Sequence, residues 1–302
     1  MSGTRKLFTA RNITLYLFLV PAAVYYIVFH YMPMYGALIA FQDFNPFKGM
    51  AGSPWVGVKH FRDFFGSVYF IRLLRNTVLL SLYGLIFGFP MPVIFALLLN
   101  EVKSRKFRSA VQTISYMPHF VSTVVLCGLI VQFLTPNTGL ISRIIENISG
   151  RPSGILDEAR WFRAIYITSG IWQGIGWGSI IYFAALTSIN PSLYEAADID
   201  GAGRIQKMIH ISLPGLLPTM VTLLILDLGR ILNIGFEKVI LLYRSSTYET
   251  ADIISTYVYR SGLISQQYSF AAAVGLFNSV VGLILVLLSN HASRRIVRQS
   301  LW

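Results

Sequence analysis

The sequence has little cysteine and little charge. Its one cysteine, Cys127, excludes a disulfide framework, an iron–sulfur cluster and a zinc site built from cysteines. Charged residues form 13% of the chain, about half the share that is usual in soluble domains, whereas 54% of the residues are hydrophobic. A soluble protein of this composition would have too little polar surface to cover its core, so the excess apolar surface must face lipid. We therefore predict an integral membrane protein.

The sequence also lacks the short motifs of several enzyme classes. There is no G-x-x-x-x-G-K-[ST] phosphate-binding loop, so the chain is not expected to bind or hydrolyse ATP. There is no HExxH zinc motif and no G-x-S-x-G elbow. No internal repeat is apparent, which counts against secondary transporters built from duplicated halves. The net charge of +12 is attributed to cytoplasmic loops that face anionic lipid, and nucleic acid is not expected as a partner.

Six apolar stretches are long enough to cross a bilayer, which needs about 20 residues per helix. They cover roughly residues 13–41, 76–99, 110–134, 162–188, 215–235 and 270–289. Lysine and arginine are densest in three short segments, before the first stretch, after the second and after the sixth. Because short basic loops set topology, both termini are predicted to be cytoplasmic. The predicted organisation is a cytoplasmic N-terminus at 1–12, a six-span domain at 13–289 and a cytoplasmic tail at 290–302.

The predicted outer connections are long, at residues 42–75, 135–161 and 236–269. The middle connection contains apolar residues at i, i+3 and i+4 spacing, namely Leu140, Ile141, Ile144, Ile145 and Ile148. This spacing predicts a short amphipathic helix that lies on the outer face.

The connection between the fourth and fifth stretches, residues 190–214, has the sequence NPSLYEAADIDGAGRIQKMIHISLP. Its Pro191 suits the first position of a helix, and Ser192 with Glu195 predicts a capping box at the start of that helix. Two glycines, at 201 and 203, are expected to end it.

A second short helix is predicted after the glycines, and Pro214 is expected to stop it before the fifth stretch begins. The local pattern therefore predicts a helix–turn–helix on the cytoplasmic surface. On these grounds alone an ordinary amphipathic connection between two membrane helices is an equally good interpretation.

The same loop resembles the EAA signature of the permeases of binding-protein-dependent ABC importers. That signature consists of E-A-A, then D-G-A, then an apolar helix and I-x-L-P. The matching residues are Glu195, Ala196, Ala197, Asp200, Gly201, Ala202, Ile211, Leu213 and Pro214. Four further segments are similar to carbohydrate permeases of the LplB type: Leu15 to Asp43 with FQDFNPF, WVGVKHF at 55–61, YETADIISTYVYR at 248–260, and the closing SLW.

The resemblance implies an all-α integral membrane protein with six transmembrane helices, the type I ABC importer permease fold, in a bacterial cell membrane. It implies four partners besides membrane lipid: a second homologous permease, two ATPase subunits that hold ATP and Mg, and an extracellular solute-binding lipoprotein. An oligosaccharide or a polysaccharide-derived sugar would be the cargo. This chain would be a transport subunit with no cofactor of its own, and not an enzyme.

By the same resemblance, the loop at 190–214 would be the coupling helix that docks into a groove of the ATPase. The residues carried over to this contact are Glu195, Ala196, Ala197, Asp200, Gly201, Ala202, Leu213 and Pro214.

Charged residues in the fifth stretch are candidates for the substrate path. Asp227 and Arg230 are three residues apart and share a helical face, to which Asn233 adds a further polar position. A charge at membrane depth costs a few kcal/mol, which favours a functional role. An intrahelical ion pair that neutralises itself is the competing interpretation.

The fourth stretch has glycines at 170, 174 and 178, a row that predicts close helix packing. Trp172, Gln173 and Trp177 are interleaved with this row and are the candidates for lining the passage. Gly84 and Gly88 in the second stretch are given a packing role only. Two other classes of function stay open on the residues alone: a self-contained channel or secondary transporter, and a membrane-embedded enzyme.

Overall fold

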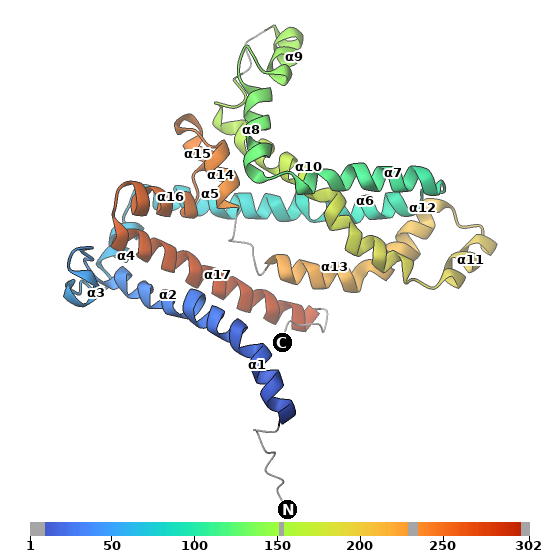
Figure 1. Ribbon diagram of the computed structural model, residues 1–302. Helices are drawn as coiled ribbons and strands as arrows, with labels where there is room; N and C mark the ends of the chain where they lie inside the picture. The colour runs from blue at the N-terminus through green and yellow to red at the C-terminus, as the bar shows by residue number, and fades with distance from the viewer. Residues whose placement is uncertain (1–9, 151–153, 229–234, 297–302) are drawn as a thin grey trace, which may run out of the picture. The chain divides into compact units, whose positions relative to one another are not determined.

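Long apolar helices dominate the computed structural model, which describes residues 10–150, 154–228 and 235–296 (Figure 1). Four helices among these residues are long and apolar enough to cross a membrane: Tyr16–Phe41, Phe70–Asn100, Arg204–Leu228 and Tyr268–Leu288. A bent pair, Arg105–Phe120 and Thr123–Leu134, would be a fifth span, with a bend of 97°. The regular elements of the described residues are all helical, so the all-α prediction is confirmed.

The remaining expected span, residues 162–188, lies in helix α10 (Ala159–Thr187). This helix has 29 residues and is roughly 43 Å long, enough to cross a bilayer. Its glycine, tryptophan, glutamine and serine residues lower its hydropathy, and it is not among the apolar helices counted above.

The chain divides into two compact units. Unit 1 consists of Met1–Gly66 and Val258–Phe277, and unit 2 consists of Ser67–Tyr257 and Asn278–Trp302. The helical elements that lie wholly in unit 1 are α1 (Ala10–Tyr26), η1 (Ile27–Tyr31), α2 (Met32–Met34), η2 (Tyr35–Phe41), α3 (Gly49–Gly52), α4 (Lys59–Phe65) and η7 (Arg260–Ile264). Two helices contribute to both units, α16 (Ile254–Tyr259) and α17 (Tyr268–Ile296).

In unit 1, aromatic packing and a hydrogen bond join distant parts of the chain. The ring of Phe64, which is fully buried, packs edge-on against Phe270 and Phe277 at centroid distances of 6.3 and 5.6 Å. The backbone N–H of Phe44 donates to Ser269 Oγ over 2.8 Å. These contacts fix the segment after the first span against the start of α17.

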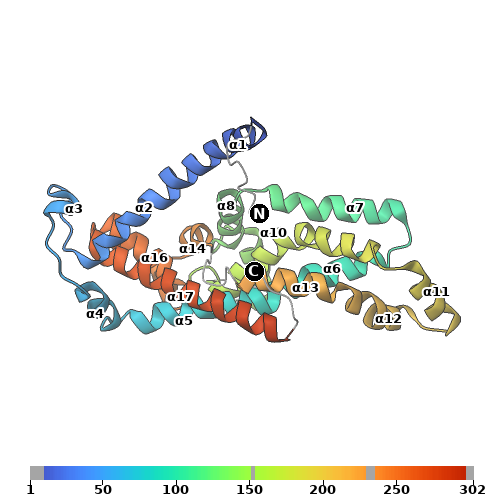
Figure 2. The same ribbon diagram turned by 90° about the horizontal axis from the view of Figure 1, so that it is seen from below.

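Unit 2 contains the remaining elements and is built around α10. The elements before α10 are α5 (Phe70–Tyr83), η3 (Gly84–Gly88), α6 (Pro90–Asn100), α7 (Arg105–Tyr116), η4 (Met117–Phe120), α8 (Thr123–Leu134) and α9 (Leu140–Ser149). Those after it are α11 (Pro191–Ile199), α12 (Arg204–Lys207), η5 (Met208–Ser212), α13 (Leu213–Leu228), α14 (Phe236–Leu242), η6 (Ser245–Thr247) and α15 (Tyr248–Ala251). Helix α10 packs along α6 and also contacts α7 and α13, as Figures 1 and 2 show. The amphipathic helix predicted in the second outer connection is confirmed as α9.

Two apolar cores pack against opposite ends of α10. Phe162 belongs to the core formed with α5, α8 and α14, whereas Tyr182 and Leu186 belong to the core formed with α6 and α13. Phe162 and Tyr182 are 20 residues apart, which places them roughly 30 Å from one another along the helix. The segment of α10 between them is rich in glycine and is where the cavities described below are found.

A buried polar cluster fixes the segment 248–256 to α5 and α10. The carboxylate of Asp252 has no solvent exposure; it accepts a hydrogen bond from Thr256 Oγ1 at 2.8 Å and pairs with Arg72 at 3.5 Å. Asn76 is also fully buried, and its Nδ2 donates to the carbonyl of Asp252 while its Oδ1 accepts from Arg163. Reasoning from the sequence did not find this cluster, because its members come from three separated segments.

Candidate functional site

The first helix of the loop at 190–214 is α11, and its cap differs from the prediction. The side chain of Asn190 is the N-cap and accepts a hydrogen bond from the backbone N–H of Ser192 at 3.1 Å. Pro191 occupies the first turn, as predicted. The predicted capping box of Ser192 with Glu195 is wrong, because Asn190 starts the helix earlier and leaves Ser192 inside it. Glu195 is therefore an exposed residue of the helix rather than part of its cap.

The turn after α11 ends the helix where the glycines predict. Gly201 has a φ of +76°, a conformation that glycine adopts without the steric cost a Cβ brings. The N–H of Ala202 donates to the carbonyl of Ala197 and the N–H of Gly201 donates to that of Asp198, at 2.8 and 3.2 Å. This pair of bonds is the Schellman arrangement that closes a helix C-terminus. Nothing lies within 4 Å of the position a Cβ would take at Gly201, so the tip of the turn is open.

The prediction that Pro214 stops the second helix is wrong. Elements α12, η5 and α13 follow one another without a break and form the apolar helix Arg204–Leu228, in which Pro214 is the second residue of α13. A π turn at Met208–Ser212 widens the helix directly before the proline, so the absent N–H and the bulky ring are accommodated. The loop therefore continues directly into the fifth span.

Two side-chain contacts connect α11 to this continuous helix. The hydroxyls of Tyr194 and Ser212 share a hydrogen bond of 2.9 Å, and Ser212 is 1% exposed. Lys207 Nζ donates to Asp198 Oδ1 at 2.5 Å. These contacts attach α11 to the start of the fifth span. The sequence gives only a weak signal for them, since the partners are 9 and 18 residues apart.

The surface of the loop is apolar as well as acidic. Leu193, Ile199 and Ile205 are 52%, 87% and 70% exposed. Within unit 2, α11 extends beyond the ends of α6, α7 and α10 (Figures 1 and 2). Of the residues carried over to the ATPase contact, Glu195, Ala196, Asp200, Gly201 and Pro214 are exposed and Ala197, Ala202 and Leu213 are half-buried. Large exposed apolar side chains gathered on one loop are typical of a surface that a partner covers.

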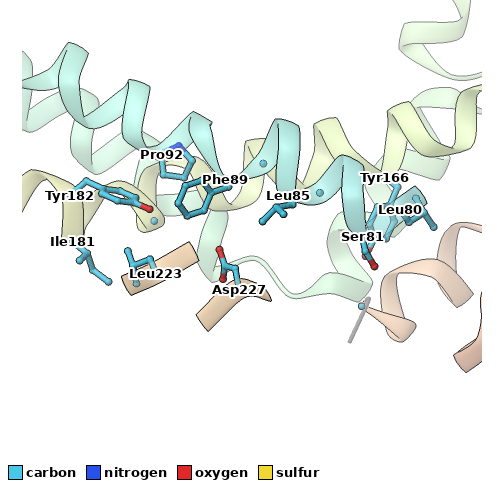
Figure 3. Close-up of a pocket in the computed structure, with 14 residues that line it drawn as sticks. Leu80, Ser81, Leu85, Phe89, Pro92, Tyr166, Ile181, Tyr182, Leu223 and Asp227 are labelled. Carbon is cyan, nitrogen blue, oxygen red and sulfur yellow. The ribbon is translucent and has the colours of Figure 1, made fainter. Parts of the chain in front are cut away.

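A cavity of about 480 Å³ lies in unit 2 between the second span, α10 and α13. Asp227 enters it from α13, opposite Leu85 and Phe89 (Figure 3). Tyr166 and Ser81 lie at one end of the cavity. A second cavity of about 370 Å³ shares Gly84, Gly88, Pro92 and Tyr166 with the first. Helix α13 therefore begins beside the loop and ends at the wall of the larger cavity.

The predicted path residues are placed in different surroundings. Asp227 lines the larger cavity, whereas Arg230 and Asn233 lie outside the described residues, as does the ion pair proposed for Asp227. Gln173 lines the smaller cavity, and its Nε2 donates to the carbonyl of Val121 at 2.8 Å.

The two tryptophans predicted for the path, Trp172 and Trp177, are not among the residues that line these cavities. Trp177 stacks on His119 with a centroid distance of 4.5 Å and nearly parallel rings. Trp172 lines a separate apolar groove of about 490 Å³ formed with α8 and α9.

The glycine row of α10 has three different environments. A Cβ at Gly178 would lie 3.0 Å from Pro92, which agrees with a packing role. A Cβ at Gly170 would lie 3.3 Å from Lys238 Nζ, and one at Gly174 would have nothing within 4 Å. The tightest approach on α10 is at Gly176, outside the predicted row, where a Cβ would lie 2.1 Å from the carbonyl oxygen of Ser115. In the second span, the packing role predicted for Gly88 is not supported, since a Cβ there would have nothing within 4 Å.

Residues 88–298 match the family of binding-protein-dependent transport system inner membrane components. The chain belongs to this family. It is 44% identical to the protein LplB of Bacillus subtilis (strain 168) over 292 residues, which are 97% of this chain and 92% of that protein. It is 45% identical to the polygalacturonan/rhamnogalacturonan transport system permease protein YteP of the same organism over 288 residues, 95% of this chain and 90% of that protein.

Solved structures agree with this membership. A bacterial alginate ABC transporter in complex with an alginate pentasaccharide-bound periplasmic protein contains a chain that is 47% identical to this one, with a TM-score of 0.89. The match covers 96% of this chain and 97% of that chain. As an inner membrane component of this family, the present chain is a multi-pass transport subunit with the ABC importer permease fold, and not an enzyme.

Proposed function

We propose that this chain is one of the two permeases of a bacterial ABC importer and forms half of the translocation pathway for an oligosaccharide or a polysaccharide-derived sugar. The observation that carries the proposal is the continuous helix Arg204–Leu228. It joins the exposed loop with the EAA signature, at one end, to the wall of the cavity that Asp227 lines, at the other. A displacement of the loop is thereby transmitted to the cavity.

The proposed topology has six spans. The bent pair around η4 counts as one span and α10 as another. An even number of spans leaves both termini on the same side, and the short basic segments favour the cytoplasmic side. Residues 1–12 and 290–302 are then cytoplasmic ends, 13–289 is the transmembrane domain, and the loop at 190–214 faces the cytoplasm.

The proposed partners are a second homologous permease, two ATPase subunits and an extracellular solute-binding lipoprotein. The ATPase subunits carry ATP and Mg, and this chain binds no cofactor. The loop contacts the ATPase through the acidic and small residues of the EAA signature, and the exposed side chains of Leu193, Ile199 and Ile205 supply apolar area to the same contact. ATP-driven closure of the ATPase pair then moves the loop and α13 and exchanges inward for outward access to the cavity.

Saccharide as cargo is supported by the relatives. YteP is named as a permease for polygalacturonan and rhamnogalacturonan, and the solved transporter was crystallised with a periplasmic protein that holds an alginate pentasaccharide. Both cavities also have the composition that suits sugars, since aromatic rings and polar groups lie among small residues.

Reconstitution by omission tests the proposal. The chain is placed in liposomes with its partner permease, ATPase subunits and binding protein, and uptake of a labelled oligosaccharide is measured. Uptake is expected from the full set, and loss of uptake is expected on leaving out any one component. Robust ATP-independent uptake by this chain alone would contradict the proposal and favour a self-contained transporter or channel.

A further inference from the structure

We propose that Lys238 is the specificity-determining cation of this permease and that it binds a carboxylate of the cargo, which is therefore an acidic saccharide containing uronate units. This inference rests on the proposed function and names the substrate class of the same pathway.

Lys238 is a buried lysine with spare donors. It lies in α14 and is 8% exposed. Its Nζ donates to the backbone carbonyl of Tyr166 at 2.9 Å and lies 4.8 Å from the centre of the Tyr166 ring. An ammonium group has three N–H donors, so this carbonyl satisfies one of them. Among the described residues, no carboxylate lies within 4.0 Å of this nitrogen.

A buried ammonium without a counter-ion is costly, because transfer from water removes its hydration and nothing of opposite charge replaces it. A methionine or leucine would fill the same volume without that cost. The lysine is therefore expected to have a task that needs its charge, and an anionic group of the cargo would supply the absent counter-ion when bound.

The surroundings of Lys238 provide room for such a group. The smaller cavity of about 370 Å³ is lined by α10, by the second span and by Lys238, which is the one charged residue among the described residues of its wall. On this wall, Gly88 and Gly174 have nothing within 4 Å of where a Cβ would be. The space therefore lies open in the described part of the chain.

Two further residues fit an acidic sugar. The aromatic ring of Tyr166 and the amide of Gln173 lie on the same wall and match the apolar face and the hydroxyls of a pyranose. Gly170 permits the placement of the ammonium, because a Cβ there would lie 3.3 Å from Nζ. The larger, adjoining cavity has Asp227 on its wall, which suits hydroxyl donors rather than carboxylates.

The competing role is mechanical, since the bond to the Tyr166 carbonyl also attaches α14 to α10. The two roles predict different results when the charge is removed. A mechanical lysine affects every cargo equally, whereas a recognition lysine affects the carboxylate form selectively.

The experiment uses the assembled importer in proteoliposomes. The probes are short oligogalacturonates and oligoalginates, each paired with its methyl ester, which has the same size and no charge. The variants are Lys238→Met, Lys238→Arg and, as a control, Lys106→Met, whose lysine is exposed on α7. The readout is the ratio of acid uptake to ester uptake, with ATPase recovery and thermal stability measured alongside.

Lys238→Met is expected to lower that ratio about tenfold or more, since a charge-assisted hydrogen bond is lost, while ester uptake stays within about twofold of the wild type. Lys238→Arg and Lys106→Met are expected to keep the preference for the acid. An unchanged ratio in Lys238→Met overturns the inference, whether both probes enter normally or both fail together. A wild type that accumulates esters and no acid also overturns it, whereas a wild type that accumulates neither contradicts the proposed function instead.

Discussion

Gly174 lies in the middle of α10, where a Cβ would contact nothing within 4 Å. Glycine inside a helix is about 1 kcal/mol less favourable than alanine, so packing does not explain its presence here. Its position on the cavity wall does explain why no large side chain is found here, because such a side chain would occupy the cavity.

This gives a prediction at the residue scale. Gly174→Ala should raise the thermal unfolding temperature and leave uptake close to normal, because a methyl group fits and favours the helix. Gly174→Leu should abolish saccharide uptake while the protein stays folded, because the larger side chain fills the space the cargo needs. Unfolding in detergent and uptake in liposomes are the two measurements.

Gly176 is the matched control for this pair. A Cβ there would lie 2.1 Å from the carbonyl oxygen of Ser115, so Gly176→Ala should destabilise the protein by forcing α7 and α10 apart. If Gly174→Leu transports normally, the glycine does not border the pathway.

Asn76 gives a prediction about stability. It is fully buried and joins the carbonyls of Glu249 and Asp252 to the guanidinium of Arg163. Asn76→Ala should lower the free energy of unfolding by about 2 kcal/mol or more, because several buried polar groups lose their partner together. Exposed Asn147→Ala is the control, and equal unfolding temperatures for the two variants would show that the polar cluster contributes little.

At the scale of elements, we expect α11 to move together with the continuous helix Arg204–Leu228. Helix α11 is attached to the continuous helix by the Tyr194–Ser212 hydrogen bond and by the ion pair between Lys207 and Asp198. Surface ion pairs contribute little, and the side chain of Asp198 is 61% exposed. The bond to the buried hydroxyl of Ser212 is therefore expected to be the stronger connection.

Tyr194→Phe should uncouple the importer. The ATPase should still co-purify, since the exposed surface of the loop is unchanged. The saccharide transported per ATP hydrolysed should fall about fivefold, the size expected for losing one hydrogen bond of about 1 kcal/mol. Tyr35→Phe, at a residue 69% exposed, serves as control. Normal stoichiometry in Tyr194→Phe would mean that this bond does not transmit the movement.

The elements of this loop also illustrate what the sequence can predict. Gly201 and Pro191 act locally, and their effects follow from backbone chemistry alone. Whether the helix continues through Pro214 depends on the π turn that precedes it. Which residue caps α11 depends on competition between Asn190 and Ser192, and local patterns do not decide it. The Tyr194–Ser212 bond requires knowledge of how two helices fold back on one another.

For the molecule as a whole, the apolar stretches and the EAA signature predict the fold class and the family, because both depend on contiguous residues. The cavity walls come from helices far apart in the chain, and Lys238 was expected only to belong to an outer connection. Its role emerges when α14 is placed against α10, a tertiary contact with no periodic signal in the sequence.

The central claim is that the loop at 190–214 is the contact through which ATPase subunits drive this permease. Gly201→Asp tests it most directly. Aspartate is among the non-glycine residues that adopt positive φ most readily, and nothing in the described chain lies within 4 Å of the new Cβ. The loop should therefore keep its fold, and the added charged side chain should affect only a partner that covers the tip.

The matched control is Gly150→Asp, because Gly150 also has a positive φ, +66°, and an open Cβ position, but follows α9. Tagged permease is purified from membranes, and recovery of the ATPase and of the partner permease is scored for both variants. Gly201→Asp should lose ATPase about tenfold or more, the effect of roughly 1.4 kcal/mol, and keep the partner permease, while Gly150→Asp should keep both. Full ATPase recovery and normal uptake in Gly201→Asp would show that the loop is an ordinary connection between two membrane helices.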